Sequence, residues 1–182
     1  LPVANSLNTV YAKFRNGVGG PESSCLTAQI LHDSSLPTVV ITAPAAGTAI
    51  NLGTVSAFPV SGTCSEEGRS VLVRVGAATS TAVCSGGVFS RAVDFSSVAD
   101  GSVVADVSQT DIAGNSSPPS SRVFLKDTVP PLAAIGAPAA LTVMTPLTET
   151  AFVVSGSCSE NGQSILLSGA AAGSAVCAAG SW

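Results

Sequence analysis

The nine residues VSGTCSEEG, at Val60–Gly68, are written a second time as VSGSCSENG at Val154–Gly162. The cysteines at the centre of the two phrases, Cys64 and Cys158, are 94 positions apart. Further landmarks recur at 93 or 94 positions: LHDSSLP at 31–37 and LKDTVPP at 125–131, Cys84 and Cys177, and Phe89 and Trp182. This period is about the length of one small β-sandwich domain.

Superposition of the repeats predicts the domain organisation. Residues 37–130 form one complete repeat, residues 1–36 match only the end of a repeat, and residues 131–182 match only its first half. We therefore expect one complete domain flanked by parts of two others, with both ends of the sequence lying inside domains.

The composition favours short strands over helices. Only 10% of the 182 residues are charged and 4% are aromatic, while 18 glycines and 11 prolines interrupt the chain at short intervals. Such frequent Gly and Pro favour short strands joined by tight turns. The low charge argues against intrinsic disorder, which usually accompanies high net charge and few branched apolar residues.

Seven segments of the complete repeat alternate between apolar and polar residues, as strands buried on one face should. In one segment Val71, Val73 and Val75 share a face, and in another Val103, Ala105 and Val107 do. The segments are 38–42, 57–64, 70–76, 79–84, 88–95, 102–110 and 121–126. They predict an all-β fold of tandem immunoglobulin-like β-sandwiches with about seven strands per repeat.

Arg91 disturbs one of these segments, because it has the same parity as Phe89, Val93 and Phe95. Two explanations are open. Either the stem of Arg91 packs and its head leaves at the rim of the sheet, or a β-bulge shifts the register there.

Charge and hydropathy exclude two classes of partner. The net charge is −4, the sequence pI is about 4.7, and the seven basic residues are scattered, so no nucleic-acid footprint is present. No run of 18 apolar residues occurs, so no membrane-spanning segment is predicted.

Four stretches resemble the bacterial Ig-like repeats of large secreted and cell-surface, adhesin-type proteins. They are PTVVITAPAAGTAIN at 37–51, VSGTCSEEGRSVLVRVG at 60–76, residues 82–117, and KDTVPP at 126–131. Residues 1–36 resemble the last two strands of a more divergent repeat. The resemblance implies non-enzymatic stalks, spacers or adhesive surfaces with an extracellular or cell-surface location. It also implies neighbouring Ig-like domains, of the same or adjacent chains, and a host or cell-surface ligand as candidate partners.

The cysteines are predicted to form two disulfide bonds. One strand runs away from the pole that holds Cys64 and the next strand returns, so Cys64 and Cys84 should meet there, as should Cys158 and Cys177. The spacings of 20 and 19 fit no zinc motif, and disulfides would place the protein outside the reducing cytosol. Buried free thiols are the alternative. For Cys25 a partner outside this sequence, a free thiol and an intermolecular bond are all open.

Catalytic motifs are missing from the sequence. His32, the single histidine, is expected in an interdomain linker, and no GxSxG or Ser–His–acid order is present. The glycine-rich GVGG and SGG segments precede no helix, so they are turns and not phosphate loops. We expect a protein that is not an enzyme and requires no cofactor.

Acidic residues gather where the domain junctions are expected. Several oxygen ligands converging at a junction would suit Ca²⁺, which takes six to eight oxygens in flexible geometry. Alternatively these are polar loop residues, with Asp111 and Asn115 bonding their own turn. The candidates are Asp33, Glu66, Glu67 and Asp111 at the first junction, and Asp100, Asp127 and Glu160 at the second.

Two functions are compatible with these features. The first is a rod of tandem repeats that acts as a stalk or spacer, because the Pro-containing linkers SSLPT and TVPPL are too short for free swinging. The second is a filament whose subunits join head to tail, with strands of residues 1–36 completing the partial sandwich of another copy. A carbohydrate-binding module is disfavoured because one Trp and one Tyr cannot build an aromatic platform.

Overall fold

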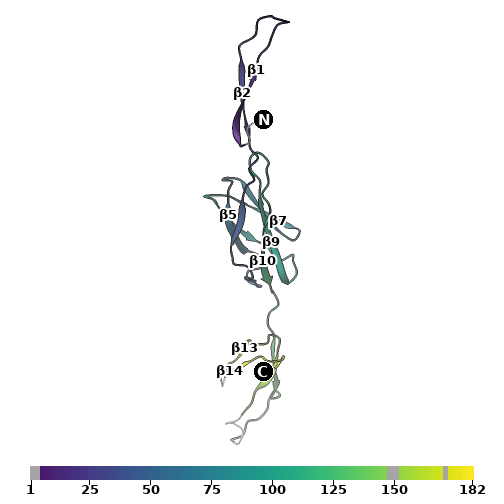
Figure 1. The fold of residues 1–182 in the computed structure, drawn as a ribbon. Helices are drawn as coiled ribbons and strands as arrows, with labels where there is room; N and C mark the ends of the chain where they lie inside the picture. Colours follow the sequence, from purple (N-terminus) through teal and green to yellow (C-terminus); the bar gives the residue numbers. More distant parts are fainter. Residues whose placement is uncertain (1–4, 147–151, 170–171) are drawn as a thin grey trace. The chain divides into compact units, whose positions relative to one another are not determined.

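A computed structural model describes residues 5–146, 152–169 and 172–182. In these residues every regular element is a β-strand (Figure 1), and they contain no helix long and apolar enough to cross a membrane. Two compact units are formed, Leu1–Thr128 and Val129–Trp182. The strands of the first unit are β1 (Ser6–Ala12), β2 (Leu26–His32), β3 (Val39–Ala43), β4 (Ala49–Ile50), β5 (Phe58–Cys64), β6 (Ser70–Val75), β7 (Ala78–Val83), β8 (Val88–Val93), β9 (Gly101–Gln109) and β10 (Ser120–Lys126).

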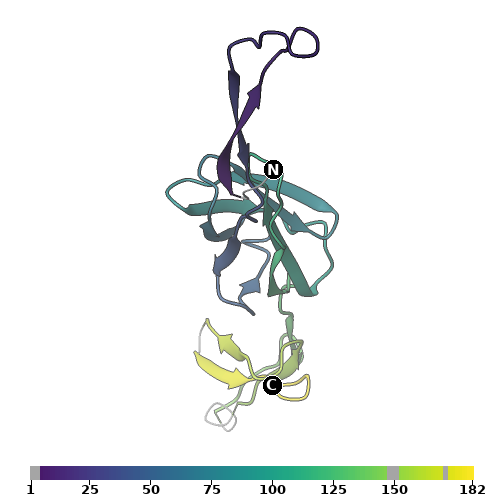
Figure 2. The same ribbon diagram turned by 45° about the horizontal axis from the view of Figure 1, so that its top comes forward.

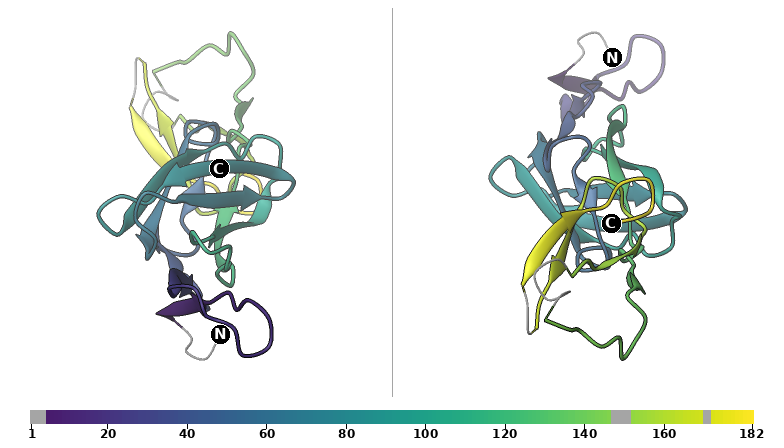
Figure 3. Two further views of the ribbon diagram at one scale, coloured as in Figure 1. Left: turned by 90° about the horizontal axis from the view of Figure 1, so that it is seen from above. Right: turned by 90° about the horizontal axis from the view of Figure 1, so that it is seen from below.

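Residues 37–128 fold as a sandwich of two sheets (Figure 3). A five-stranded sheet has the order β4-β10-β9-β6-β7, and a three-stranded sheet has the order β3-β5-β8. All pairs are antiparallel except β4 with β10. This all-β, Ig-like arrangement confirms the fold class expected from the sequence.

Each predicted strand is present within about two residues of its expected bounds, and β4 is an additional strand. The valines of β6 and the three expected residues of β9 are buried, as their alternation predicted. The register between β5 and β8 is uninterrupted, and Arg91 is exposed on β8 at the edge of its sheet. The uninterrupted register shows that the bulge explanation for Arg91 is wrong. Arg91 instead lies on the edge strand of its sheet, where a charged side chain reaches water.

β4 exists because the chain changes sheets after β3. The register with β5 shifts between Ile41 and Ala43, and the chain then crosses to pair in parallel with β10. The guanidinium of Arg122, on β10, donates to the carbonyl oxygens of Ile41, Thr42 and Pro44 at 2.5 Å, 3.0 Å and 2.6 Å. This fork satisfies carbonyls that the shifted ladder leaves unpaired.

The core lies between the two sheets. Phe58, Phe95 and Phe124 form an edge-to-face cluster with ring centroids 5.1 to 6.2 Å apart. Aromatic pairs at these distances contribute beyond the area that they bury. Four of the six phenylalanines, Phe58, Phe89, Phe95 and Phe124, are buried in this core.

The β1–β2 hairpin, drawn in purple in Figure 2, has the same register as β9–β10. Ser6 pairs with His32 and Ala12 with Leu26, just as Gly101 pairs with Lys126 and Val107 with Ser120. Both ladders contain seven residue pairs, and β2 lies 94 residues before β10. The hairpin therefore has the form of the last two strands of a repeat.

The second unit contains β11 (Ala133–Ala137), β12 (Ser155–Cys158), β13 (Ser164–Leu167) and β14 (Gly173–Val176). β11 pairs with β12, and β13 with β14, as β3 pairs with β5 and β6 with β7. Even the register shift is repeated, between Ile135 and Ala137. The unit therefore rebuilds the first strands of the sandwich.

Candidate functional site

A disulfide bond closes the pole of the sandwich where the repeated phrase lies. Cys64 ends β5 and Cys84 directly follows β7, and their sulfurs are 2.05 Å apart with Cα atoms at 6.0 Å. In the second unit Cys158 and Cys177 form the same bond, at 2.02 Å and 6.0 Å. A bridge across 20 residues stabilises a domain by about 3 kcal/mol in the chain-entropy model. We call the residues around each bridge the disulfide-closed pole.

The serine after each cysteine holds the segment that enters the domain. The Thr38 amide donates to Ser65 Oγ at 2.9 Å, and the Ser65 amide donates to the Thr38 carbonyl at 3.0 Å. Leu132 and Ser159 exchange the same two bonds, both at 2.9 Å. This reciprocal pair of bonds, the serine clasp, fixes the start of each sandwich.

The third residue after each cysteine caps a neighbouring loop. Glu67 accepts hydrogen bonds from the amides of Gly86 and Gly87, at 3.0 and 3.2 Å. Asn161 takes the same position in the second phrase and accepts from the Gly180 amide at 3.0 Å. Because a neutral amide replaces the carboxylate, the shared role is hydrogen-bond acceptance and not negative charge.

Two glycines of the phrase are required by the backbone. A Cβ on Gly62 would lie 1.8 Å from the Val40 carbonyl oxygen and 2.8 Å from the Phe89 ring. A Cβ on Gly156 would meet the Ala134 carbonyl oxygen at 1.8 Å and the Trp182 ring at 2.9 Å. Gly68 has φ +73°, a left-handed conformation that suits glycine. The phrase therefore combines a close approach, a bridge and a turn.

Gln109 joins two loops of the first pole, and the sequence reasoning missed it. Its side chain accepts from the Glu66 amide at 3.2 Å and donates to the Glu66 carbonyl at 2.9 Å, while only 1% of the residue is exposed. Arg69 adds bonds to the carbonyls of Thr110 and Asp111, at 3.3 and 3.1 Å. The available signal was parity, because Gln109 continues the buried series Val103, Ala105 and Val107.

Asp111 stabilises its own turn. Its carboxylate accepts from the Asn115 amide and from Asn115 Nδ2, each at 2.8 Å, and Asn115 Nδ2 also donates to the Asp33 carbonyl at 3.2 Å. Burial opposes ionisation of Asp111, but the bonds from Asn115, Gly114 and Ala113 outweigh it and hold the pKa below its usual value. These contacts fit the alternative in which Asp111 and Asn115 bond their own turn.

Asp100 and Lys126 lie at the opposite end of the sandwich. Lys126 Nζ is buried, 2.8 Å from Asp100 Oδ1, and donates to the Val98 carbonyl at 2.8 Å. Asp100 also accepts from the Thr128 amide and hydroxyl, at 2.9 and 3.0 Å. The Lys126 hydrogen bond and then the Thr128 amide lower the pKa of Asp100. The ionised carboxylate therefore neutralises a buried cation and holds the segment that leaves the domain.

Among the acidic calcium candidates, Asp33 and Asp111 are linked through Asn115, which donates to the Asp33 carbonyl and to the Asp111 carboxylate. In the described parts of the chain, no three His, Cys, Asp or Glu side chains are grouped so that they could hold a metal ion. The Asp127 amide bonds the Ile50 carbonyl, and Asp33 Oδ1 accepts from Ser35. Glu66 and Glu160 each lie beside the hydroxyl of the preceding serine, at 3.1 and 3.5 Å.

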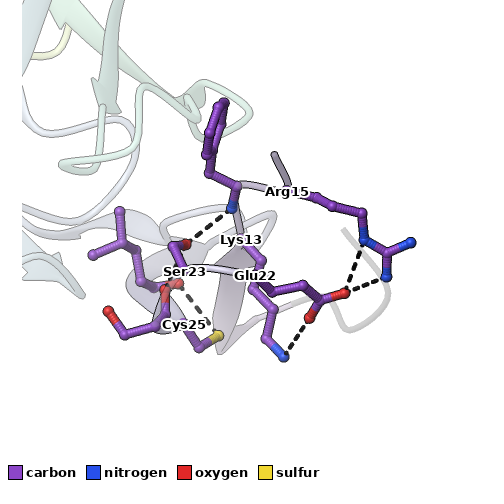
Figure 4. A network of polar contacts seen from close by, with 8 residues as sticks. Lys13, Arg15, Glu22, Ser23 and Cys25 are labelled. Carbon is purple, nitrogen blue, oxygen red and sulfur yellow. Dashed lines mark hydrogen bonds and ion pairs between the residues drawn. The ribbon is translucent and has the colours of Figure 1, made fainter. Parts of the chain in front are cut away.

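Cys25 is an exposed free thiol just after the loop of the β1–β2 hairpin. Nearby, Glu22 forms ion pairs with Arg15 and with Lys13, the latter at 3.3 Å, and Ser23 Oγ accepts from the Phe14 amide (Figure 4). Arg15, and then Lys13, lower the pKa of Glu22. The ion pairs cross the base of the loop and fix the two strands at that end.

The described residues show no catalytic arrangement. Hollows on the outer face of the five-stranded sheet are lined by such residues as Leu72, Arg74, Asp106 and Ser108, and they contain no histidine or cysteine. The expectation that His32 lies in a linker is wrong, because it is the last residue of β2 and pairs with Ser6. These residues build the disulfide-closed pole and hold the segments that enter and leave the sandwich.

Three solved structures of adhesion proteins are similar to this chain. A bacterial immunoglobulin-like domain from the M. primoryensis ice-binding adhesin is 27% identical, with a TM-score of 0.41 over 52% of this chain and 100% of that one. A tetra-tandem repeat in the extending region of a large adhesion protein is 20% identical, with a TM-score of 0.48 over 99% of this chain and 48% of that one. A structure concerning host cell surface retention of a 1.5-MDa bacterial ice-binding adhesin is 18% identical, with a TM-score of 0.43 over 98% and 62%.

This chain thus spans less than two thirds of the length of the last two structures. No protein-family model matches its sequence, and no curated protein does.

Proposed function

We propose that this chain is a non-enzymatic segment of a bacterial extracellular or cell-surface protein, in which tandem Ig-like repeats form a stalk or spacer. The observation that carries the proposal is the duplication of the disulfide-closed pole. Bridge, serine clasp, loop cap and close-approach glycine all recur at a spacing of 93 or 94 residues. Proteins that repeat one structural unit along the chain build extended arrays from it.

The bridges also support the proposed location. Disulfides persist in oxidising compartments and are rare in the cytosol, and each of the two units contains one. Neighbouring Ig-like domains are then the first partners of each repeat, and a host or cell-surface ligand is a further candidate.

The test is to locate the repeat in the cells that make it. An antibody raised against the intact chain should stain whole, unpermeabilised cells, and immunoblots should detect a band many repeats in size. A matched antibody against a cytosolic protein should stain only permeabilised cells. Staining that also requires permeabilisation, or a band carrying a measurable enzymatic activity, would overturn the proposal.

A second candidate is a filament joined head to tail by strand complementation, and one observation favours it. The β1–β2 hairpin has the register of β9–β10, which is the hairpin that completes the sheet beside β6 in the first sandwich. β13 is the counterpart of β6, so the hairpin of one copy fits beside β13 of another. Light scattering decides between the candidates. The filament predicts assemblies whose masses are multiples of 17.8 kDa and that disappear when residues 1–36 are deleted. The stalk predicts a monomer.

A further inference from the structure

The segment that leaves a repeat is held by the side chain of the residue that directly precedes the terminal hairpin of that repeat. Asp100 accepts from the amide of Thr128 at 2.9 Å and from its hydroxyl at 3.0 Å. Asn5 holds Ser34 in the same way, with its Oδ1 accepting from the Ser34 amide at 2.6 Å and from the hydroxyl at 3.0 Å. We call this pair of bonds the exit clamp.

The strand registers show that the two exit clamps are equivalent. Asn5 directly precedes Ser6, which pairs with His32, and Asp100 directly precedes Gly101, which pairs with Lys126. On the other strand the held residues, Ser34 and Thr128, are 94 positions apart and both carry a hydroxyl. The clamp therefore recurs at matching positions of two repeats, although their loops differ in sequence and length.

Each exit clamp is followed by the serine clasp of the next domain after three residues. Residues 35–37 separate the clamped Ser34 from the clasped Thr38, and residues 129–131 separate Thr128 from Leu132. Both three-residue segments end in a proline, Pro37 or Pro131. Proline fixes its own φ and restricts the preceding residue to extended conformations.

We propose that every junction of the stalk is a double-clamped joint. An exit clamp and a serine clasp anchor the two ends of a three-residue, proline-terminated segment, and together they limit the swing of one repeat against the next. The inference rests on the proposed stalk function and supplies its mechanical element. In this joint Asp100 acts as an acceptor for the linker.

The comparison of the two clamps separates this role from metal binding. Asn5 is neutral and makes the same two bonds as Asp100. A calcium site would depend on the negative charge of its ligands, whereas a clamp requires only an oxygen acceptor. The negative charge of Asp100 instead neutralises the buried Lys126, whose Nζ lies 2.8 Å from Asp100 Oδ1. In the hairpin the residue that corresponds to Lys126 is His32.

¹⁵N relaxation of the full chain tests the joint. In the wild-type chain the amides of Thr128 and Val129 should have order parameters of about 0.85, typical of rigid backbone, and the two units should share one correlation time. Thr128→Ala removes the hydroxyl bonds and leaves the Asp100–Lys126 pair intact, so the sandwich should stay folded. We expect these order parameters to fall to about 0.6 or below, and the second unit to tumble faster than the first. Ser159→Ala should loosen the same joint from its other side.

The double variant Asp100→Asn/Lys126→His is the matched control, because it recreates the Asn5 and His32 combination of the hairpin and leaves no buried lysine without its counter-charge. Its linker should be as ordered as that of the wild type, and millimolar Ca²⁺ or EGTA should change no order parameter. The proposal is overturned if Thr128→Ala leaves the linker rigid, if the double variant loosens it as much as Thr128→Ala does, or if EGTA alone loosens it. Surface staining of cells is independent of these results. Mobile joints on a surface-exposed protein would refute the joint alone, and a cytosolic protein would refute the stalk.

Discussion

The two disulfide-closed poles are built from the same phrase over unequal surroundings. In the first unit Cys64 and Cys84 are buried, and Gln109 of β9 accepts a hydrogen bond from the nearby Glu66 amide. In the second, Cys158 is half-buried and Cys177 is buried. The bridge, clasp, cap and glycine contact are nevertheless present in both. The comparison teaches that the phrase encodes a local device, because its contacts form in both units although Cys64 is buried and Cys158 is only half-buried.

The largest effect is expected from filling the close approach at Gly62. Gly62→Ala would place its Cβ against the backbone oxygen of Val40, and backbone yields less readily than a side chain. We expect a loss of about 3 kcal/mol or more in the free energy of unfolding, at the upper end of overpacking costs. Urea denaturation of the full chain measures it.

Gly156→Ala makes the same change in the second pole and should unfold the second unit while leaving the first intact. Gly53→Ala is the control, because its Cβ would meet only the Asn51 side chain at 3.4 Å. Equal stability of the Gly62 and Gly53 variants would show that the glycine of the phrase is not required.

Removing one bridge tests whether the poles are independent. Cys64→Ala/Cys84→Ala should cost the first unit about 3 kcal/mol and leave the second unchanged, because each bridge closes a loop within its own unit. Thermal unfolding followed by near-UV circular dichroism, with and without a reducing agent, measures the change. Cys25→Ser, at the exposed free thiol, should have no effect. A bridge-free variant as stable as the wild type would contradict the account.

Gln109→Met tests the contact that joins β9 to the loop after Cys64. It would remove the acceptor of the part-buried Glu66 amide and one of the two donors to the Glu66 carbonyl, which also accepts from the Arg69 amide at 3.2 Å. The unpaired amide costs about 1 to 3 kcal/mol. Urea denaturation should show this loss, and hydrogen exchange should accelerate at Glu66. Gln29→Met, on the exposed face of β2, is the matched control. Unchanged exchange at Glu66 would show that Gln109 does not hold the loop.

Acid should destabilise the first unit through Asp100 and Asp111. The pKa of each is lower in the folded chain than its usual value of about 3.9. Their contribution is complete above that value and is lost as the pH falls through the lower, folded-state pKa values. A stability profile between pH 5 and pH 2 should therefore fall with decreasing pH, and Asp111→Asn should flatten it. A profile that rises toward low pH would contradict the assignment.

Calcium should produce the smallest effect. Four acidic candidates of the first unit already accept hydrogen bonds from backbone amides, namely Asp33, Glu67, Asp100 and Asp111. Asp100 is also paired with Lys126. We expect the melting temperature to be unmoved by millimolar Ca²⁺ or by EGTA. A rise with Ca²⁺ that Asp111→Asn abolishes would instead support a calcium site at the junction.

The sequence predicted the fold well because its signals are local. Alternation placed Val71, Val73 and Val75 in the core, and glycines and prolines marked the turns. β4 escaped prediction because two residues carry no period. Its position depends on Arg122, which bonds the carbonyls of a strand some 80 residues earlier in the chain.

The candidate site was predictable in part. The expected path of the strands indicated which cysteines lie together, but the roles of Glu67 and Asp100 depend on amides in other loops. The sequence placed the acidic residues at the junctions, but it could not show which amide, hydroxyl or lysine each of them contacts. The equivalence of Asn5 with Asp100 became visible only from strand register, because the residue type differs.

The central claim is that the repeated phrase, at Val60–Gly68 and Val154–Gly162, builds the same disulfide-closed pole in both units. Disulfide mapping tests this claim most directly. Digestion of the unreduced chain with trypsin and a Glu-specific protease cuts between the cysteines of each pair, at Arg69 and Glu160 among other sites. Mass spectrometry should then find Cys64 linked to Cys84, Cys158 linked to Cys177, and Cys25 alkylated as a free thiol. A Cys64–Cys158 link, or free thiols at all five positions, would contradict the account.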